Sequence, residues 1–156
     1  MSLSELITEA RVVGSCHVSS KKRLLESLGE LLASSSDSLT PETVFDCLLE
    51  RERLGSTGLG QGVALPHARS PAVRAPVGAF IRLCAPVGFD SIDDQPVDLA
   101  FGLLVPEAAN EQHLQLLSGL ARLFDNPGFR QRLRDAADSQ TVFEILATAR
   151  LELTAT

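Results

Sequence analysis

The sequence of 156 residues has no tryptophan, no tyrosine and only seven phenylalanines. Proteins that bind single-stranded nucleic acid commonly stack the bases on aromatic side chains, and this chain offers little for such stacking. Positive charge is also scarce, because 14 lysines and arginines stand against 20 acidic residues, for a formal net charge of −6. Binding to a phosphate backbone needs the opposite balance. We therefore expect no nucleic-acid partner.

Long hydrophobic runs are missing as well. No apolar segment approaches the roughly 18 residues that a membrane-spanning helix requires, so we expect no membrane insertion. The first residues, MSLSELITEARVV, lack the basic and apolar segments of a secretory signal. Cys16, Cys47 and Cys84 form no CxxC pair, which predicts reduced thiols packed as small hydrophobic side chains. Together these absences indicate a cytoplasmic protein.

What is present is typical of one globular domain, with 44% hydrophobic and 22% charged residues. A chain of this length buries about two-thirds of the surface that it exposes when unfolded. We find no internal repeat and no composition shift that would mark a domain boundary. The prediction is a single domain over residues 1–156, with an ordered core at about residues 5–150.

Hydrophobic spacing predicts helices at both ends of the chain and strands between them. A helix is expected at about residues 20–34, capped by Ser19 or Ser20, and another at about 41–53, with Thr40 as N-cap and Pro41 in the first turn. Apolar runs predict strands at 63–65, 77–84 and 97–105. The last run is almost wholly apolar and is expected to be a central strand, covered on both sides. Pro66 is expected to end strand pairing.

Three further helices are predicted after the strands. They start near Asn110, Phe129 and Ser139, with Asn110 and Ser139 as candidate caps. This order of elements predicts an α/β (α+β) domain in which helices flank both faces of a mixed sheet.

The segment from Gly55 to Gly62 carries four of the eleven glycines in eight residues. It fits neither common phosphate-binding pattern. A Walker A loop would need lysine where Gln61 stands, and a dinucleotide-binding loop would need GxGxxG between a strand and a helix. The glycines allow positive φ angles and bring backbone N–H groups close to a bulky or anionic group. A glycine-rich turn without a ligand is the alternative.

His67 follows the glycines and Pro66 at the end of a predicted strand, where α/β proteins often place chemistry. His113 falls in the first turn of a predicted helix, and Arg51 lies just ahead of the glycines. If the strand ends are neighbours, these three side chains meet. An imidazole with one nitrogen held and the other free, surrounded by donors, suits a phosphoryl acceptor.

A zinc site is the rival use of two histidines. Zinc needs a third ligand, and the chain has no HxH or HxxxH pair, so we expect no metal. His17 has no evident partner and is expected to be structural or exposed.

The stretch RERLGSTGLGQGVALPHA resembles the phosphorylation site of the fructose/mannitol-type enzyme IIA proteins of the bacterial phosphotransferase system. The resemblance covers nearly the whole chain, through SSKKRLLE, FDSIDDQPVDLAFGLLVP and EQHLQLLSGLARLF. Within the family it is strongest to the stand-alone nitrogen-regulatory type. It implies the enzyme IIA fold and no cofactor.

The resemblance also implies roles for residues. His67 would accept the phosphoryl group on Nε2 from an HPr-like phosphocarrier, His113 would be the second active-site histidine, and Arg51 would stabilise the phosphate. Six loop residues would surround the phosphoryl group: Ser56, Thr57, Gly58, Gly60, Gln61 and Gly62. Gln61 stands where many nitrogen-type relatives have asparagine, a change that keeps the amide.

Two alternatives to a regulatory phosphocarrier remain open. A sugar-specific enzyme IIA would pass its phosphoryl group to an enzyme IIB, often fused to it, and this sequence has no room for such a domain. A protein-binding module without phosphoryl transfer is the other alternative, although Arg51, His67 and His113 are all present. The regulated protein target is not identified by the sequence.

Overall fold

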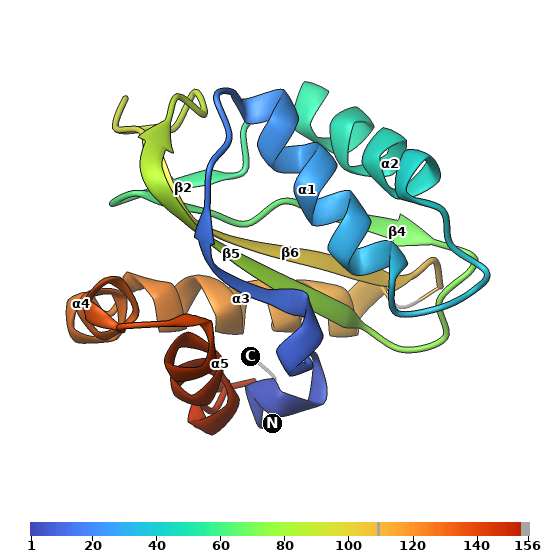
Figure 1. Ribbon diagram of the computed structural model, residues 1–156. Helices are drawn as coiled ribbons and strands as arrows, with labels where there is room; N and C mark the ends of the chain where they lie inside the picture. The colour runs from blue at the N-terminus through green and yellow to red at the C-terminus, as the bar shows by residue number, and fades with distance from the viewer. Residues whose placement is uncertain (109, 154–156) are drawn as a thin grey trace.

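The computed structural model describes residues 1–108 and 110–153, with the side chain of residue 110 also outside the description (Figure 1). The described residues form a six-stranded mixed sheet and five α-helices, with two short 3-10 helices near the N-terminus. The strands are β1 (Val12–Cys16), β2 (Gly58–Gly60), β3 (Val63–Ala64), β4 (His67–Ser70), β5 (Val77–Val87) and β6 (Val97–Pro106). The helices are η1 (Leu3–Glu5), η2 (Glu9–Arg11), α1 (Lys21–Ala33), α2 (Pro41–Arg53), α3 (Asn110–Asp125), α4 (Pro127–Asp135) and α5 (Ser139–Thr148).

The sheet is built around β6, as its apolar sequence predicts. The strand order is β1-β5-β6-β3-β2, and β4 also pairs with β6. β6 runs antiparallel to β5 and parallel to β3 and β4, while β1 is parallel to β5. All its residues from Leu99 to Val105 are buried. The prediction of a central strand covered on both faces is confirmed.

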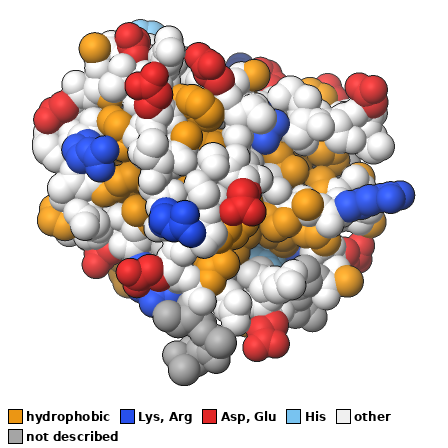
Figure 2. All heavy atoms as spheres, turned by 90° about the horizontal axis from the view of Figure 1, so that it is seen from below, with side chains coloured by type: hydrophobic (Ala, Val, Ile, Leu, Met, Phe, Trp, Pro, Cys, Tyr) orange, Lys and Arg blue, Asp and Glu red, His pale blue; other side chains and the backbone are white. Residues whose placement is uncertain are grey.

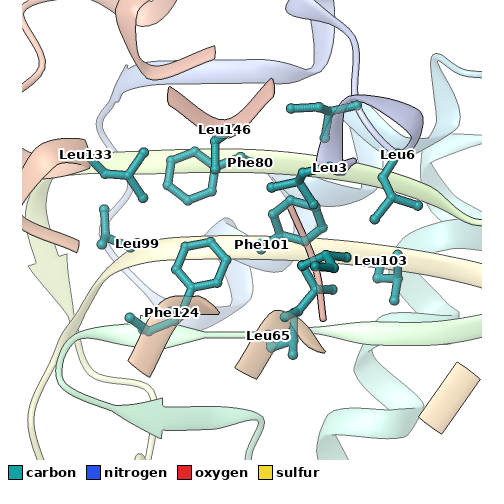
Figure 3. Close-up of a cluster of buried hydrophobic side chains, with 14 of the residues drawn as sticks. Leu3, Leu6, Leu65, Phe80, Leu99, Phe101, Leu103, Phe124, Leu133 and Leu146 are labelled. Atoms are coloured by element: carbon teal, nitrogen blue, oxygen red, sulfur yellow. The ribbon is translucent and has the colours of Figure 1, made fainter. Parts of the chain in front are cut away.

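Helices cover both faces of the sheet. In Figure 1, α1 and α2 lie on one face, and α3 and α5 lie with η1 on the other. Alternate side chains of β6 serve the two sides, as strand geometry requires: Phe101 and Leu103 belong to the core under α3, and Ala100 and Leu104 to the core under α1. Figure 3 shows the first core, where Phe124 of α3 meets Phe80 and Phe101. The predicted α/β domain, in which helices flank both faces of a mixed sheet, is therefore confirmed.

The two N-terminal helices begin where their capping residues predict. The Ser20 hydroxyl accepts a hydrogen bond from the Arg23 N–H, and the Thr40 hydroxyl accepts one from the Thr43 N–H. The last helix differs, because Asp138 rather than Ser139 is its N-cap. The Ser139 hydroxyl instead accepts the Gly14 N–H of β1. The predicted capping role of the residue 110 side chain lies outside the description.

Strand pairing is interrupted at Pro66, as predicted, but it does not end there. The strand breaks only at Leu65 and Pro66, and β4 resumes on β6 in the same register, with Ala64 opposite Ala100 and His67 opposite Leu103. The Pro66 carbonyl accepts a hydrogen bond from the Leu103 N–H. Proline lacks the backbone N–H but keeps its carbonyl, so this carbonyl can maintain a hydrogen bond to β6 within the break. His67 therefore begins a strand.

Two other strands were not predicted. β1 is a five-residue strand at the sheet edge, and β2 forms within the glycine segment, antiparallel to β3. The cysteine prediction is wrong at one position, because Cys84 is exposed, whereas Cys16 and Cys47 are partly buried. Within the described residues, no helix is both long and apolar enough to cross a membrane.

Candidate functional site

An open cleft of about 920 Å³ lies where α2, β4 and α3 approach one another. Its lining combines two histidines, three arginines and several apolar side chains. The lining residues are Cys47, Glu50, Arg51, Arg53, Leu54, His67, Ala68, Arg69, His113, Leu114 and Leu117. Three elements that are distant in the sequence therefore contribute to one concave surface, as is usual for a binding site. Figure 2 shows hydrophobic patches beside charged groups on one face, with a histidine among them.

The two histidine rings meet in this cleft. His67, the first residue of β4, is partly buried, and His113 of α3 is only 7% exposed. Their ring centroids are 5.5 Å apart, and the rings stand nearly perpendicular at 88°. The structure thus brings together the two histidines that the sequence singled out.

The tautomer of His67 follows from one hydrogen bond. Its Nδ1 lies 2.8 Å from the carbonyl oxygen of Leu65. A carbonyl can only accept, so Nδ1 carries the proton. The neutral ring then has its lone pair on Nε2, the nitrogen that is free to act as a nucleophile or ligand.

The surroundings keep His67 neutral. Burial is the main cause that lowers its pKa below the usual value, and the positive charge of Arg51 acts in the same direction. The bond to Leu65 and the negative charge of Glu52 oppose these effects without reversing them. A neutral imidazole at physiological pH is what a nucleophilic nitrogen requires.

His113 is also held in its neutral form. Burial lowers its pKa most, followed by the charges of His67, Arg69 and Arg51. Its Nδ1 is buried and has no hydrogen-bond partner among the residues that the structure describes. Such an orphaned atom costs about 1–3 kcal/mol and calls for an explanation, of which a group that binds in the cleft is one.

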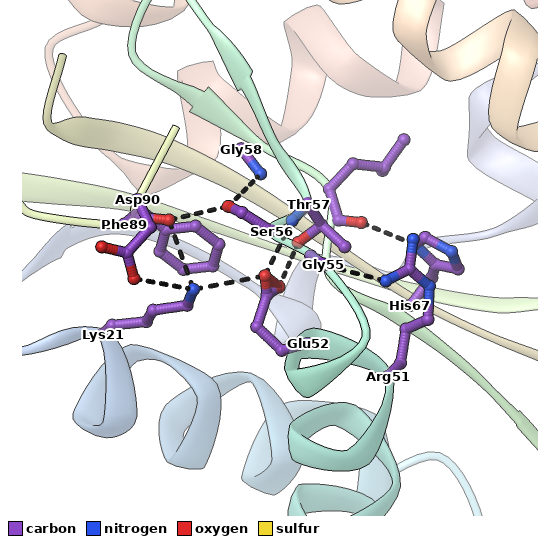
Figure 4. A network of polar contacts seen from close by, with 11 residues as sticks. Lys21, Arg51, Glu52, Gly55, Ser56, Thr57, Gly58, His67, Phe89 and Asp90 are labelled. Atoms are coloured by element: carbon purple, nitrogen blue, oxygen red, sulfur yellow. Dashed lines mark hydrogen bonds and ion pairs between the residues drawn. The ribbon is translucent and has the colours of Figure 1, made fainter. Parts of the chain in front are cut away.

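Arginines supply the positive charge of the cleft. The Arg51 guanidinium donates to the Gly55 carbonyl at 2.9 Å, which turns it back over the end of α2, beside His67 (Figure 4). Arg69 was not singled out from the sequence. It lies two residues beyond His67 in β4, and alternation along a strand puts both side chains on the same face. If a strand had been predicted from His67 onward, the alternation of its side chains would have placed Arg69 beside His67.

The cleft has an apolar rim that sequence reasoning also missed. Leu54 is 85% exposed and Leu114 is 64% exposed, and Leu117 lies one helical turn beyond Leu114. Large hydrophobic side chains held in water beside a charged cleft are typical of a protein-docking surface.

The six predicted loop residues do not line this cleft. The Ser56 hydroxyl donates to the Phe89 carbonyl, and Thr57 is bound to Glu52. The other members belong to the β2–β3 hairpin, where φ is positive at Gly60 (91°), Gln61 (59°) and Gly62 (80°).

Close packing explains why two positions in this segment are glycine. A Cβ at Gly58 would lie 2.2 Å from the Ser91 hydroxyl, and one at Gly62 would lie 2.4 Å from the Arg134 guanidinium. Arg134 also donates to the Gln61 carbonyl and pairs with Asp98. The glycines therefore build a hairpin and its contacts.

Residues 5–149 match the family described as the phosphoenolpyruvate-dependent sugar phosphotransferase system, EIIA 2. The chain belongs to this family. It is 42% identical over 144 residues to the nitrogen regulatory protein of Pseudomonas aeruginosa, covering 92% of this chain and 94% of the relative. It is 39% identical over 127 residues to the fructose-specific EIIA component of Haloferax volcanii, covering 81% of this chain and 82% of the relative.

A solved structure extends the likeness to the fold of an EIIA 2 protein. The nitrogen regulatory protein IIA-Ntr from Neisseria meningitidis superposes with a TM-score of 0.86 at 47% identity, covering 92% of this chain and 98% of that one. The predicted enzyme IIA fold is therefore confirmed. No group of three or more His, Cys, Asp or Glu side chains within residues 1–108 and 110–153 could hold a metal ion.

Proposed function

We propose that this EIIA 2 protein is a regulatory phosphocarrier that accepts a phosphoryl group on Nε2 of His67. The observation that carries the proposal is the hydrogen bond between Nδ1 of His67 and the Leu65 carbonyl, which leaves Nε2 unprotonated in a ring kept neutral by burial. The proposed donor is a phosphohistidine on an HPr-like phosphocarrier. Membership of the family supports phosphoryl transfer between proteins.

The transfer balances without a net proton. As the Nε2–P bond to His67 forms, the N–P bond of the donor breaks, and the donor imidazole, which carries a proton on its other nitrogen, leaves as a neutral ring. His67 keeps its proton on Nδ1 and gains positive charge as the bond forms. The Leu65 carbonyl faces that proton and stabilises the developing charge.

The neighbours of His67 have complementary roles in this proposal. Arg51 and Arg69 supply positive charge for the phosphoryl oxygens, and a guanidinium suits that purpose because its donors form a planar fork. His113, neutral and with an Nδ1 that no described residue contacts by a hydrogen bond, offers a further contact in the same cleft. The rim of Leu54, Leu114 and Leu117 gives the donor protein an apolar surface to dock on.

A nitrogen-regulatory role is favoured over sugar uptake. The Pseudomonas relative, named a nitrogen regulatory protein, covers more of the chain than the fructose-specific relative from Haloferax does. A phosphoryl group would add about −1.5 to −2 charges at the mouth of an arginine-lined cleft, enough to change which protein binds there. A fructose-type role, in which His67 donates to an enzyme IIB, is the second candidate because of the Haloferax relative.

The direct test is the intact mass after incubation with phosphoenolpyruvate, enzyme I and an HPr-like phosphocarrier. We expect one acid-labile phosphate on the wild type and none on His67→Ala. A wild-type protein that gains no phosphate would contradict the proposal. Transfer from the phosphorylated protein to a sugar-transport enzyme IIB would favour the second candidate over regulation.

A further inference from the structure

Glu52 is a charged residue in an unexpected place. It follows Arg51 in the last turn of α2, yet only 3% of its side chain is exposed. The two carboxylate oxygens accept hydrogen bonds from the backbone N–H and the hydroxyl of Thr57. Buried acidic side chains are rare unless they are paired. The position of Glu52 at the end of α2 does not by itself explain why its carboxylate is buried.

Lys21 compensates the buried charge. Its Nζ lies 3.3 Å from Glu52 Oε2, donates to the Phe89 carbonyl, and sits 4.4 Å from the centre of the Phe89 ring. Figure 4 shows these groups on one side of Glu52 and the Thr57 contacts on the other. Burying an ion pair costs desolvation energy, and replacing such a pair by apolar side chains of similar size often leaves the stability of a protein unchanged or higher. The arrangement therefore points to a role in specifying geometry.

A short path of hydrogen bonds leads from Glu52 to His67. Glu52 binds Thr57, the Thr57 carbonyl accepts the Leu65 N–H at 3.0 Å, and the Leu65 carbonyl accepts the Nδ1 proton of His67 at 2.8 Å. Leu65 lies in the two-residue break between β3 and β4, where it has no strand partner. Its N–H donates instead to Thr57, which lies opposite Leu65 where the β2–β3 register continues beyond Gly58 and Ala64.

We propose that Glu52 is a positioning residue for His67, which acts through Thr57 and Leu65 to hold the imidazole as the Nδ1–H tautomer with Nε2 facing the cleft. This inference deepens the proposed function and rests on it for its kinetic part. The negative charge of Glu52 also raises the pKa of His67 against the stronger lowering by burial, so the carboxylate affects the electrostatics of the ring as well as its orientation.

A purely structural role would be the simple alternative. The far end of the same segment offers a matched comparison, because Arg134 binds both Asp98 and the Gln61 carbonyl there. That ion pair is also partly buried and also secures the hairpin. It has no hydrogen-bond path to Leu65 among the contacts of Arg134 and Asp98. Loss of either ion pair should reduce stability, but only loss of Glu52 should change His67.

The experiment measures the ring tautomer of His67 by ¹⁵N NMR in the unphosphorylated protein, together with the rate of transfer from the phosphorylated phosphocarrier. Wild type should show the Nδ1–H tautomer. Glu52→Ala should show mixed tautomers and transfer at least about tenfold slower, since small misplacements of a reacting group have effects of this size. Glu52→Gln, which still accepts one hydrogen bond from Thr57, should recover most of the rate.

Asp98→Asn is the control, and we expect a wild-type tautomer and a rate within about twofold of wild type. Thr57→Val removes one of the two Glu52 contacts and should have a milder form of the effect of Glu52→Ala. It replaces Glu52→Ala in the experiment if Glu52→Ala does not fold. A wild-type tautomer and rate in folded Glu52→Ala, or in Thr57→Val if Glu52→Ala does not fold, would overturn the inference. Failure of wild type to accept phosphate would overturn the proposed function instead, and the tautomer measurement would still decide the positioning role.

Discussion

The segment from Gly55 to His67 connects two places that differ in chemistry. At the hairpin, Arg134 donates to the Gln61 carbonyl, and the Gly62 carbonyl accepts the N–H groups of Asp98 and Leu99. At the other end, His67 presents an unprotonated Nε2 to an open cleft.

The same difference is seen in the neighbours of the two ends. Arg134 is paired with Asp98, whereas within the described residues Arg51 forms a hydrogen bond only to the Gly55 carbonyl and no ion pair. His113 adds a buried nitrogen that has no hydrogen-bond partner among the described side chains and backbone. The other buried atom without a partner among the described residues, Ser91 Oγ, lies at the hairpin beside Gly58, so an unpartnered atom alone does not mark a site. We infer that glycine content marks the scaffold and that the histidines and arginines of the open cleft mark the site.

The largest effect is expected from removing the second histidine. His113→Ala should slow phosphorylation of His67 by about 100-fold, in the range seen when one preorganised contact to a reacting group is removed. The free energy of unfolding should change less than the rate, because the variant also removes a buried nitrogen that no described residue satisfies. Rapid-quench kinetics with the phosphorylated donor provide the measurement, and an unchanged rate would remove His113 from the site.

At the hairpin, Gly62→Ala should affect stability instead of chemistry. The positive φ of 80° and the close approach of Arg134 and Asp98 leave no room for a Cβ. We expect a loss of about 2 kcal/mol in the free energy of unfolding, the size typical of a strained backbone position. Urea unfolding measures it, and the transfer rate of the folded protein should stay near wild type. A large loss of rate without loss of stability would contradict the division between the two ends.

A smaller effect is expected at the apolar rim. Leu114→Ser should lower kcat/KM for the protein donor by about three- to tenfold, because one exposed hydrophobic contact contributes roughly 1 kcal/mol to docking. Ile92→Ser is the matched control, since Ile92 is 89% exposed in the loop beside the hairpin. It should leave kcat/KM unchanged. Equal losses in the two variants would show that the donor does not dock at the cleft specifically.

The smallest effect concerns the pH dependence of stability. Both cleft histidines have a lowered pKa in the folded protein, so the unfolded chain binds protons first as the pH falls. Their contribution is complete above the unfolded pKa of about 6.5 and is lost as the pH falls through the lower, folded value. Unfolding free energies measured from pH 8 to pH 5 should decline below pH 6.5. Replacement of both histidines by asparagine should flatten that part of the curve, and an unchanged slope would contradict the assignment.

Local signals allowed α1, α2 and β6 to be predicted from the sequence. Each rests on neighbouring residues, such as the Thr40 and Pro41 pair at the start of α2 or the unbroken apolar run of β6. β4 was missed because its pairing depends on β6, more than 30 residues away, and because Pro66 suggested an end to pairing. Strand pairing at long range is not visible in a short window.

The candidate site divides in the same way. His67, His113 and Arg51 were singled out from sequence spacing, and the structure places all three in one cleft. Arg69 was missed together with β4. Glu52 was missed because an acidic residue at a helix end is ordinarily solvated, and only the tertiary fold brings Thr57 and Lys21 to it.

The most direct test of the central claim is NMR of the phosphorylated protein with ¹⁵N-labelled histidine, in which coupling between phosphorus and nitrogen identifies the phosphorylated atom. The account predicts a single phosphorylated site, Nε2 of His67, with the proton retained on Nδ1. Phosphorylation at Nδ1 of His67, or on His113, would contradict it.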